Sequence, residues 1–318
     1  SSYTGTSTTG TYTGPRNILF IGTPVNDSMR GGAGDDTLRG NVGNDSVNGG
    51  PGNDVTYGGD GNDLLSDIGG ADLLSGGPGH DVINGAGPGA DVVNGGTGDD
   101  FVDAGDLGAT FLGGGGDDLY LGGAGGDGPA GDQGDDWLEG GVGADALSGD
   151  SGAPFGLDIN TPGDDVLIGG SSGDALDGGG GLDIGLDADN LAVVDEFLGD
   201  LGFDWYSYDG TAGDVNSDLG NFAPANPPGT IPAAFQDSFI DVEALSGGAG
   251  NDTLTGDDRG SLDTGFPGAT DALLAGDVAK VAGLSSLLGS AGTWDSGNIL
   301  MGGAGDDTIE GGGGNDLI

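Results

Sequence analysis

The amino-acid sequence predicts an all-β solenoid built from stacked short strands, interrupted by two insertions that contain helices. Three observations predict it: glycine supplies 79 of the 318 residues, much of the chain repeats every nine residues, and one position of each repeat is apolar. A glycine-rich chain without a period is typical of disorder, whereas a fixed short period is typical of a repeat architecture. The nonapeptide period therefore determines the fold class.

The repeat is unbroken over residues 22–148, which form fourteen nonapeptides with one extra residue inside 85–94. The sixth position is Asp in thirteen of the fourteen units, and the exception is Ala109. The eighth position is apolar or aromatic except at Thr56 and Pro129. Chance does not hold such a register over so many units, so residues 22–148 are predicted to form one continuous roll.

Each nonapeptide divides into a turn and a strand. The first six residues follow the pattern GGxGxD, in which glycines reach positive φ and leave backbone carbonyls free. The last three residues form a very short strand with one apolar side chain pointing inward. A single strand of this length buries almost nothing, but a stack of them forms a continuous apolar core, with two nonapeptides in each coil.

The charge of the chain bears on its partners. There are 53 acidic residues against 5 basic ones, giving a formal net charge of −48. Nucleic acids and anionic membrane surfaces both require a basic face, so they are excluded as partners. No apolar run is long enough to span a membrane, and the absence of Cys removes disulfides and thiolate sites. A compact state needs a cation that offsets this charge.

The turns offer the oxygen ligands that a hard cation prefers, namely carboxylates and backbone carbonyls. Calcium accepts six to eight oxygens in irregular geometry, whereas magnesium requires a tight octahedron, so the pattern favours Ca²⁺. About twenty units with roughly one ion each would bring on the order of +40, close to the formal charge of the chain. In residues 22–148 the predicted metal ligands are Asp27, Asp36, Asp45, Asp54, Asp63, Asp72, Asp81, Asp91, Asp100, Asp118, Asp127, Asp136 and Asp145.

The units GGAGDDTLR, GGDGNDLLS and GGAGNDTLT resemble GGxGxDxUx, the repeat of the RTX (haemolysin-type calcium-binding) proteins, where U is a large apolar residue. The resemblance covers 22–148, 160–186, 247–255 and 302–318. It implies a parallel β-roll, a calcium-binding solenoid with the ions held between turns by Asp side chains and Gly carbonyls. It also implies a bacterial protein that leaves the cell unfolded by type I secretion and folds in millimolar extracellular calcium. The later units add Asp165, Asp174, Asp183, Asp252, Asp307 and Asp316 to the predicted metal ligands.

Where the repeat pattern fails, the metal sites are expected to fail as well. Ala109 lacks the carboxylate, and Pro129 is expected to interrupt its strand. Residues 149–186 are predicted to hold a short surface insertion, 149–159, followed by continued roll.

Two longer interruptions separate the later units. Residues 187–246 form an aromatic α/β insertion, in which Leu191, Val194, Phe197, Leu198 and Leu201 are spaced as on a helix that begins after Asp189. In the same insertion, residues 203–208 alternate like a strand with one buried face. Residues 256–301 form a second, helical insertion before the terminal repeats at 302–318.

Catalytic interpretations are weaker than structural ones. Asp195, Glu196, Asp200 and Asp204 could be drawn as a glycosidase pair, but chance proximity is expected among so many acids. His80, the only histidine, occupies a variable turn position and is predicted to be exposed. Trp205, Tyr206 and Tyr208 are favoured as core aromatics over a sugar-binding platform. The chain is therefore predicted not to be an enzyme.

The function predicted is that of an extracellular calcium-binding structural roll that belongs to a fibre, surface layer or matrix. The Ser/Thr/Gly-rich segment 1–21 contains a T-x-T alternation that could form a strand laid on a neighbouring subunit, and self-association into a polymer or lattice is a candidate interaction. The alternative is a non-catalytic region of a larger secreted enzyme, since residues 135–318 resemble RTX regions found downstream of bacterial haem-peroxidase domains. An adhesin that binds cell-surface or matrix polysaccharide is the third hypothesis.

Overall fold

The computed structural model describes residues 9–85, 87, 89–105, 108–150, 163–186, 195–209, 211–219, 237–240, 242–257, 278 and 297–318. The chain divides into two compact units, Ser1–Pro154 and Phe155–Ile318. Every regular element whose bounds are described is a β-strand, and all the strand pairs described run parallel. The all-β parallel roll predicted from the repeat is confirmed.

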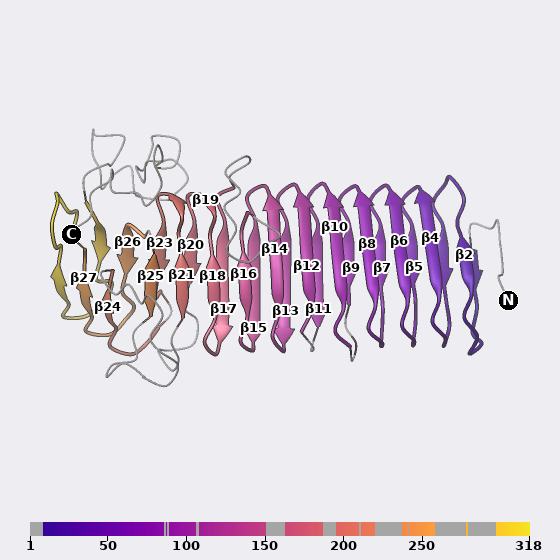
Figure 1. The fold of residues 1–318 in the computed structure, drawn as a ribbon, viewed down its shortest axis with the longest axis horizontal. Helices are drawn as coiled ribbons and strands as arrows, with labels where there is room; N and C mark the ends of the chain where they lie inside the picture. Colours follow the sequence, from indigo (N-terminus) through magenta and orange to yellow (C-terminus); the bar gives the residue numbers. More distant parts are fainter. Residues whose placement is uncertain are drawn as a thin grey trace. The chain divides into compact units, whose positions relative to one another are not determined.

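In the first unit, successive strands alternate between two parallel sheets (Figure 1). One sheet contains β1 (Thr9–Thr11), β3 (Ser28–Arg30), β5 (Ser46–Asn48), β7 (Leu64–Ser66), β9 (Val82–Asn84), β11 (Phe101–Gly105), β13 (Leu119–Ala124) and β15 (Trp137–Val142). The other contains β2 (Leu19–Ile21), β4 (Thr37–Val42), β6 (Val55–Asp60), β8 (Leu73–Pro78), β10 (Val92–Thr97), β12 (Thr110–Gly115), β14 (Gly128–Gln133) and β16 (Ala146–Ser148).

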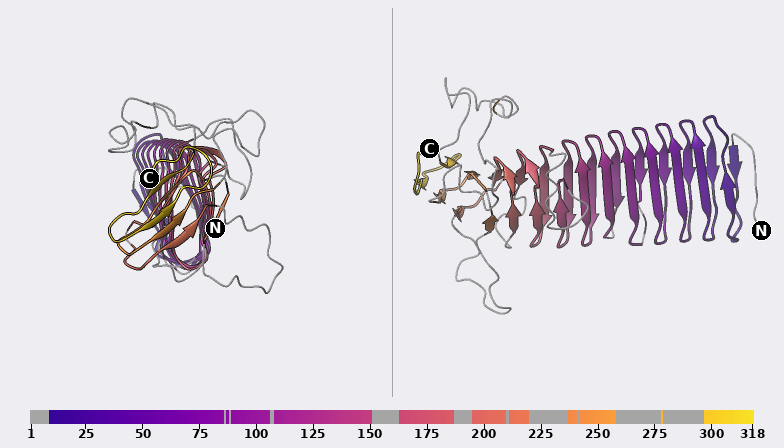
Figure 2. Two further views of the ribbon diagram at one scale, coloured as in Figure 1. Left: turned by 90° about the vertical axis from the view of Figure 1, so that its left-hand side faces the viewer. Right: turned by 45° about the horizontal axis from the view of Figure 1, so that its top comes forward.

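Two nonapeptides make one coil of this unit, as the repeat predicts. Val47 on β5 pairs with Leu65 on β7, which in turn pairs with Ile83 on β9, so each residue lies beside the one eighteen positions later. Seen along the stack, the coils of the first unit follow one another as flattened loops (Figure 2). The register places equivalent repeat positions of successive coils on top of one another.

Several strands are longer than the three residues predicted. The strands β4, β6, β8, β10, β12, β13, β14 and β15 each span six residues. The extension occurs because the residues at the start of the next turn continue the ladder, as the pairing of Asn41 with Gly59 shows. The turn and the strand therefore share residues.

The eighth repeat positions form the core of the first unit. Their side chains point between the two sheets and are fully buried at Leu38, Val47, Leu65, Leu74, Ile83, Val93, Val102, Phe111, Tyr120 and Leu138. Thr56, the polar exception, is equally buried in the same row. Phe111 and Tyr120 stack with their ring centroids 5.2 Å apart. Each nonapeptide thus contributes one side chain to a continuous apolar core.

Pro129 does not interrupt its strand, so that expectation was wrong. It lies within β14, paired with Phe111 on β12. Alternate residues of a parallel strand direct their N–H groups to opposite neighbours, and Gly128 donates to the Ala109 carbonyl on the β12 side. The missing donor of Pro129 therefore faces β16, where the pairing is reduced to Ala130 with Ser148.

The first strand corrects another expectation. The T-x-T alternation near the N-terminus does form a strand, β1, but β1 pairs with β3 of the same chain, Thr9 lying opposite Ser28. Residues 1–8 lie outside the described ranges. The partner expected on a neighbouring subunit is thus the second coil of the chain itself.

The second unit contains four sets of parallel strands. The largest comprises β17 (Val166–Ser171), β20 (Ile184–Leu186), β23 (Trp205–Ser207), β26 (Ala244–Ser246) and β28 (Ile299–Met301). A second set comprises β18 (Ala175–Asp177), β21 (Glu196–Leu198) and β25 (Ser238–Ile240), and a third β24 (Asn216–Asp218), β27 (Thr253–Thr255) and β29 (Thr308–Glu310). The short strands β19 (Gly180–Gly181) and β22 (Leu201–Gly202) pair with each other.

The helix predicted after Asp189 is wrong where the structure describes it. Residues 187–194 lie outside the described ranges, but from Asp195 onward the chain forms β21 and β22. Phe197 is fully buried and pairs with Leu176 on one side and Phe239 on the other. Burial of this aromatic in the core of the roll and the strand ladder on both sides override the helical spacing of the leucines.

The strand predicted within 203–208 is confirmed as β23, but both of its faces are buried. Tyr206 lies inside the roll, with ring centroids 5.6 Å from Phe197 and 5.1 Å from both Tyr208 and Phe239. Trp205 faces the other way and packs with Leu182, Phe203 and Val278. The burial of all three aromatics, at 7% exposure or less, favours a core role over a sugar platform.

The other predicted insertions lie mostly outside the described residues. Of the segment 149–159 the structure describes only Gly149 and Asp150. Of the helical insertion it describes the two ends and Val278, whose side chain is buried. The helices expected there stay a prediction.

Candidate metal sites

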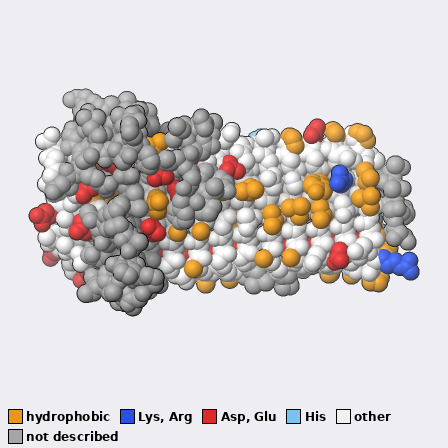
Figure 3. Space-filling model, viewed as in Figure 1, with side chains coloured by type: hydrophobic (Ala, Val, Ile, Leu, Met, Phe, Trp, Pro, Cys, Tyr) orange, Lys and Arg blue, Asp and Glu red, His pale blue; other side chains and the backbone are white. Residues whose placement is uncertain are grey.

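The sixth-position aspartates of the first unit form two rows, one along each edge of the roll. The first row contains Asp27, Asp45, Asp63, Asp81, Asp100, Asp118 and Asp136, and the second contains Asp36, Asp54, Asp72, Asp91, Asp127 and Asp145. All thirteen side chains are at most 4% exposed. On the face of the molecule seen in Figure 3, few acidic side chains of the first unit are visible.

In every one of these residues except Asp27, one carboxylate oxygen accepts a backbone N–H from the preceding coil. The backbone N–H of Asp27 donates to Asp45 Oδ1 over 2.7 Å, and Asp45 donates in the same way to Asp63. The second row repeats the pattern from Asp36 to Asp54 and from Asp54 to Asp72. Because the next coil supplies the acceptor for an otherwise unpaired amide, these aspartates fix the spacing of the turns.

The second carboxylate oxygen is buried and has no hydrogen-bond partner. This holds for Oδ2 of Asp36, Asp45, Asp54, Asp63, Asp72, Asp81, Asp100 and Asp118. A buried charged oxygen without a partner is costly, because burial removes its hydration and nothing replaces it. The unpartnered oxygens recur at equivalent places along both rows, so they are a property of the repeat.

The first-position glycines open a space beside these oxygens. A Cβ atom on Gly76 would overlap Asp81 Oδ2 and lie 2.7 Å from the carbonyl oxygen of Gly95. A Cβ atom on Gly95 would overlap Asp100 Oδ2 and lie 2.8 Å from the next carbonyl in line, that of Gly113. Glycine therefore preserves a cradle lined by one carboxylate and one carbonyl oxygen from the following coil.

This donor set fits calcium. All the atoms that line the cradle are oxygens, and calcium binds carboxylate and carbonyl oxygens with little demand for regular geometry. Mg²⁺ fits less well, because it keeps several waters and requires an octahedron. The residues that would hold the ion are the sixth-position aspartates, through Oδ2, together with the glycine carbonyls.

Burial raises the pKa of these carboxyl groups above the ordinary value for Asp. It raises the pKa of Asp54 to about 6 and of Asp63 and Asp118 to about 7, with neighbouring carboxylates adding to the effect. The hydrogen bond from the preceding coil opposes this shift in each case but does not overcome it. From Asp27 to Asp118, no carboxylate of the two rows makes an ion pair with Lys or Arg in the described structure.

The second unit has rows of the same kind. Of its predicted ligands, Asp165, Asp174, Asp183 and Asp252 are buried, whereas Asp307 and Asp316 are partly exposed in the last two repeats. Asp165 donates its N–H to Asp183 Oδ1 over 2.9 Å, as in the first unit. Metal binding by the nineteen predicted ligands stays a prediction.

The rows also contain residues that the repeat pattern missed. Asp195 accepts the N–H of Asp174, and Asp204 accepts that of Asp183. Asp237 and Glu243 continue the two rows after them. An Asp two residues before a buried aromatic is the signal, since Asp195 precedes Phe197 and Asp204 precedes Tyr206 at the spacing of the sixth and eighth positions.

Two further residues depart from the pattern. Ala109 is buried at a sixth position and supplies no carboxylate, so the second row is interrupted between Asp91 and Asp127. Asp67 stands at a first position, where most units have glycine, and is only 1% exposed. The repeat pattern predicted neither the burial of Asp67 nor its contacts.

His80 lies on the outside of a turn. Its side chain is 57% exposed, and its Nδ1 accepts the N–H of Asp99 over 2.7 Å. Asn62 Oδ1 accepts the N–H of His80 in the same way, as part of a row of fifth-position side chains. His80 is therefore hydrogen-bonded to the turns of the coils on both sides of it.

Comparisons with known proteins agree with the site. The model of the RTX calcium-binding nonapeptide repeat matches residues 21–56, 57–87, 86–106, 130–155, 161–184, 241–258 and 295–318, together more than half of the chain. No curated protein matches the sequence. Among the parts of the chain that the structure describes, no helix has the length and apolar character to cross a membrane. With its nonapeptide register, parallel roll and buried carboxylate rows, the chain belongs to the family of proteins with RTX calcium-binding repeats.

Proposed function

We propose that the chain is a non-enzymatic structural roll whose folding depends on calcium. The observation that supports this most directly is the recurrence of buried, unpartnered carboxylate oxygens beside glycine cradles on both edges of the first unit. Every turn with an acidic sixth position offers carboxylate and carbonyl oxygens to a cation, and the described Lys and Arg residues do not pair with these carboxylates.

The magnitudes favour a cation over packing alone. Each nonapeptide buries one apolar side chain at the eighth position, which stabilises the fold by about 1.5–3 kcal/mol. Every nonapeptide of the first unit except that of Ala109 also buries one carboxylate, and a buried unpaired charge costs several kcal/mol. At neutral pH the cost of the charged rows therefore exceeds the gain from the core. Bound calcium supplies the positive charge that offsets the carboxylates.

In this proposal the residues of the chain hold the coils in register, bind the ion and exclude water from the core. The Oδ1 atoms hold the coils in register through backbone N–H groups, the Oδ2 atoms and the glycine carbonyls present oxygens to the ion, and the eighth-position side chains exclude water from between the sheets. On this basis we expect roughly one ion per turn where the sixth position is acidic. Removal of the ions would leave the carboxylates close together without a compensating charge, and we expect their repulsion to unfold the roll.

The finer part of the proposal concerns location and assembly. Calcium sites of this kind suit the millimolar calcium outside cells, which supports a secreted bacterial scaffold that folds after export and assembles into a fibre, surface layer or matrix. Filaments in electron micrographs at millimolar calcium would support the assembly, whereas single particles alone would contradict it. The alternative is a non-catalytic region of a larger secreted enzyme, such as a peroxidase, and a gene that continues into a catalytic domain would decide for it.

Calorimetric calcium titration of Asp63→Asn tests the calcium sites. Asparagine keeps an oxygen that can accept the N–H of Asp45 but loses the charge and the second carboxylate oxygen. We expect about one ion fewer to bind at saturation, and the local affinity to fall roughly 10- to 100-fold because a charged ligand is lost.

Asp60→Asn is the matched control. Asp60 lies three residues away, is exposed, and carries the same charge. The control is expected to bind as many ions as the unaltered chain. An equal loss in both variants would show that calcium binding follows net charge and that the sixth-position sites are assigned wrongly.

A further inference from the structure

Asp67 carries a carboxylate into a place that other repeats reserve for glycine. It is the first residue of the unit DIGGADLLS, and the first positions one coil earlier and one coil later are Gly49 and Gly85. Its backbone holds the usual position, because its N–H donates to the carbonyl of Asn84 over 2.9 Å. Only the side chain is new relative to the repeat.

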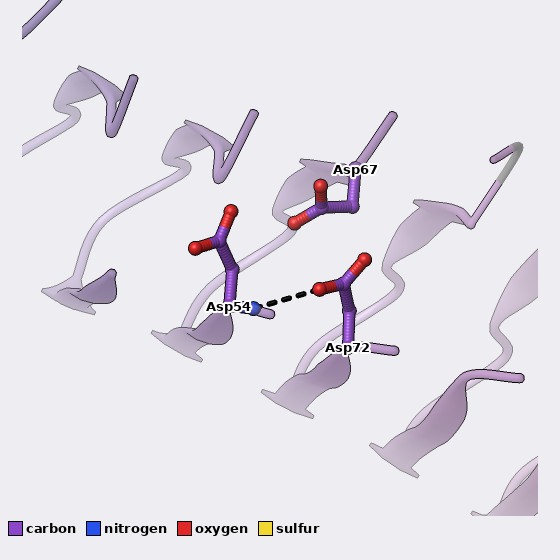
Figure 4. Close-up of side chains that lie close together, drawn as sticks. All are labelled: Asp54, Asp67 and Asp72. Carbon is purple, nitrogen blue, oxygen red and sulfur yellow. Dashed lines mark hydrogen bonds between the residues drawn. The ribbon is translucent and has the colours of Figure 1, made fainter. Parts of the chain in front are cut away.

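Figure 4 shows that this side chain joins two members of the second row, Asp54 and Asp72. Each of the three offers a carboxylate oxygen, and these oxygens all lie within 4.8 Å of one another. The exposed fractions are 1% for Asp54 and Asp67 and 4% for Asp72. Elsewhere in the described residues no other group of three His, Cys, Asp or Glu side chains comes so close.

Each of these carboxylates has one oxygen in a hydrogen bond and one without a partner. Asp54 Oδ1 accepts the N–H of Asp36, Asp72 Oδ1 accepts that of Asp54, and Asp67 Oδ1 accepts the N–H of Ile68. Oδ2 of all three is buried and unpartnered. Three buried oxygens thus remain available to a ligand at one place.

The glycine cradle at this place differs from its neighbours. A Cβ atom on Gly49 would overlap Asp67 Oδ2 and lie 2.5 Å from Asp54 Oδ2. At Gly76 the corresponding atoms are one carboxylate oxygen, from Asp81, and one carbonyl oxygen. The cradle at Gly49 is therefore lined by two carboxylates, with Asp72 close by.

The electrostatics of the three groups point the same way. Burial, then the charge of Asp72, raise the pKa of Asp67 to about 8, and burial raises that of Asp54 to about 6. Three carboxylates this close cannot all ionise in a buried place without a cation between them. In EF-hand loops the number of charged ligands is one of the main determinants of calcium affinity.

We propose that Asp54, Asp67 and Asp72 form a three-carboxylate calcium site that binds more tightly than the other turns of the roll and fills first. This site rests on the proposed function, because it uses the same cradle and the same ion. Its occupation would hold together two nonapeptides that lie one coil apart, 49–57 and 67–75, and give the neighbouring coils a folded edge on which to stack. Asp67 is thus assigned as a ligand that the repeat pattern does not contain.

Competition between the chain and a chromophoric calcium chelator tests this site, with calcium chloride as the only added metal. For the unaltered chain we expect one ion bound at least tenfold more tightly than the rest. Asp67→Gly restores the residue found at most first positions, so it is compatible with the roll, and it is expected to lose the tight ion while the weaker ions remain. Asp67→Asn keeps the shape without the charge and is expected to lose it as well.

The outcomes distinguish this site from the function on which it rests. Asp60→Asn serves as the charge control and is expected to keep the tight ion. If the tight ion persists in both Asp67 variants, or if the unaltered chain shows a single affinity class, the three-carboxylate site is wrong while calcium binding stands. If the unaltered chain binds no calcium, the proposed function itself fails.

Discussion

In excess chelator the chain is expected to lose its β structure as the pH rises from about 4 to about 8, and to regain it on acidification. Burial raises the pKa of Asp63 and Asp100 to about 7 and of Asp136 to about 8, from an ordinary Asp value of 3.8. Between those limits the folded state binds more protons than the unfolded state. Stability therefore falls as the pH rises, since each raised pKa contributes stability that is full below about 4 and lost by about 8.

Calcium is expected to reverse this dependence. Ligand carboxylates must lose their protons to bind a metal, so calcium affinity rises over the same range of pH. Far-ultraviolet circular dichroism across pH 4–8 measures the β signal against pH, once in excess chelator and once in millimolar calcium. A chelator sample whose β signal strengthens toward pH 8 would contradict the assignment of the rows as buried, unpaired acids.

Gly113→Ala is expected to remove one metal site and to destabilise the calcium-loaded roll by about 1–3 kcal/mol or more. The added Cβ would overlap Asp118 Oδ2 and the carbonyl oxygen of Gly131, the two oxygens that line this cradle. Neither atom can move freely, because Asp118 Oδ1 is held by the N–H of Asp100 over 2.8 Å and the carbonyl belongs to the next coil. Thermal unfolding in saturating calcium, together with the number of ions bound, measures the effect.

Gly115→Ala provides a control two residues further along β12. A Cβ there meets nothing closer than Gln133 Oε1 at 3.7 Å, an ordinary contact. Its effect is expected to stay within about 0.5 kcal/mol, as for surface substitutions that disturb no special feature. Similar losses at both positions would mean that glycine serves backbone freedom here and that the cradle has no separate role.

The sequence predicted the first unit well because its determinants are local and periodic. The sixth-position aspartates and eighth-position apolar residues repeat at fixed spacing, and stacking brings equivalent positions together. The length of the strands was not predictable in the same way. It depends on whether turn residues such as Asn41 find a pairing partner in the next coil, which is a property of the stack.

The second unit was harder to predict because several of its repeats keep only the acidic sixth position and the apolar eighth position. In residues 195–207 most glycines are gone, and Leu198 and Leu201 add an apparent helical period to a stretch that forms strands. Asp195 with Phe197 and Asp204 with Tyr206 keep the spacing of the sixth and eighth positions, and the structure places both pairs in the rows and in the core. Tertiary burial of the aromatics decides between the two periods.

Asp67 illustrates what a single sequence cannot show. Its residue type is common in this chain, and its position in the repeat marks it only as a departure from glycine. Asp67 and Asp72 are the first and sixth residues of one nonapeptide, and the eighteen-residue coil brings both beside Asp54 of an earlier nonapeptide. The repeat register alone does not locate the three-carboxylate site, because it does not show that the Asp67 side chain points toward Asp54 and Asp72.

The central claim is that calcium is required for the roll to fold. Far-ultraviolet circular dichroism of the purified chain during a calcium titration at neutral pH, with magnesium as the control, tests it most directly. We expect a cooperative change from coil to β structure with calcium and none with magnesium at the same concentration, since the cradles present irregular sets of oxygen ligands. A β spectrum already complete in excess chelator would contradict the account, because packing alone would then hold the buried carboxylate rows together.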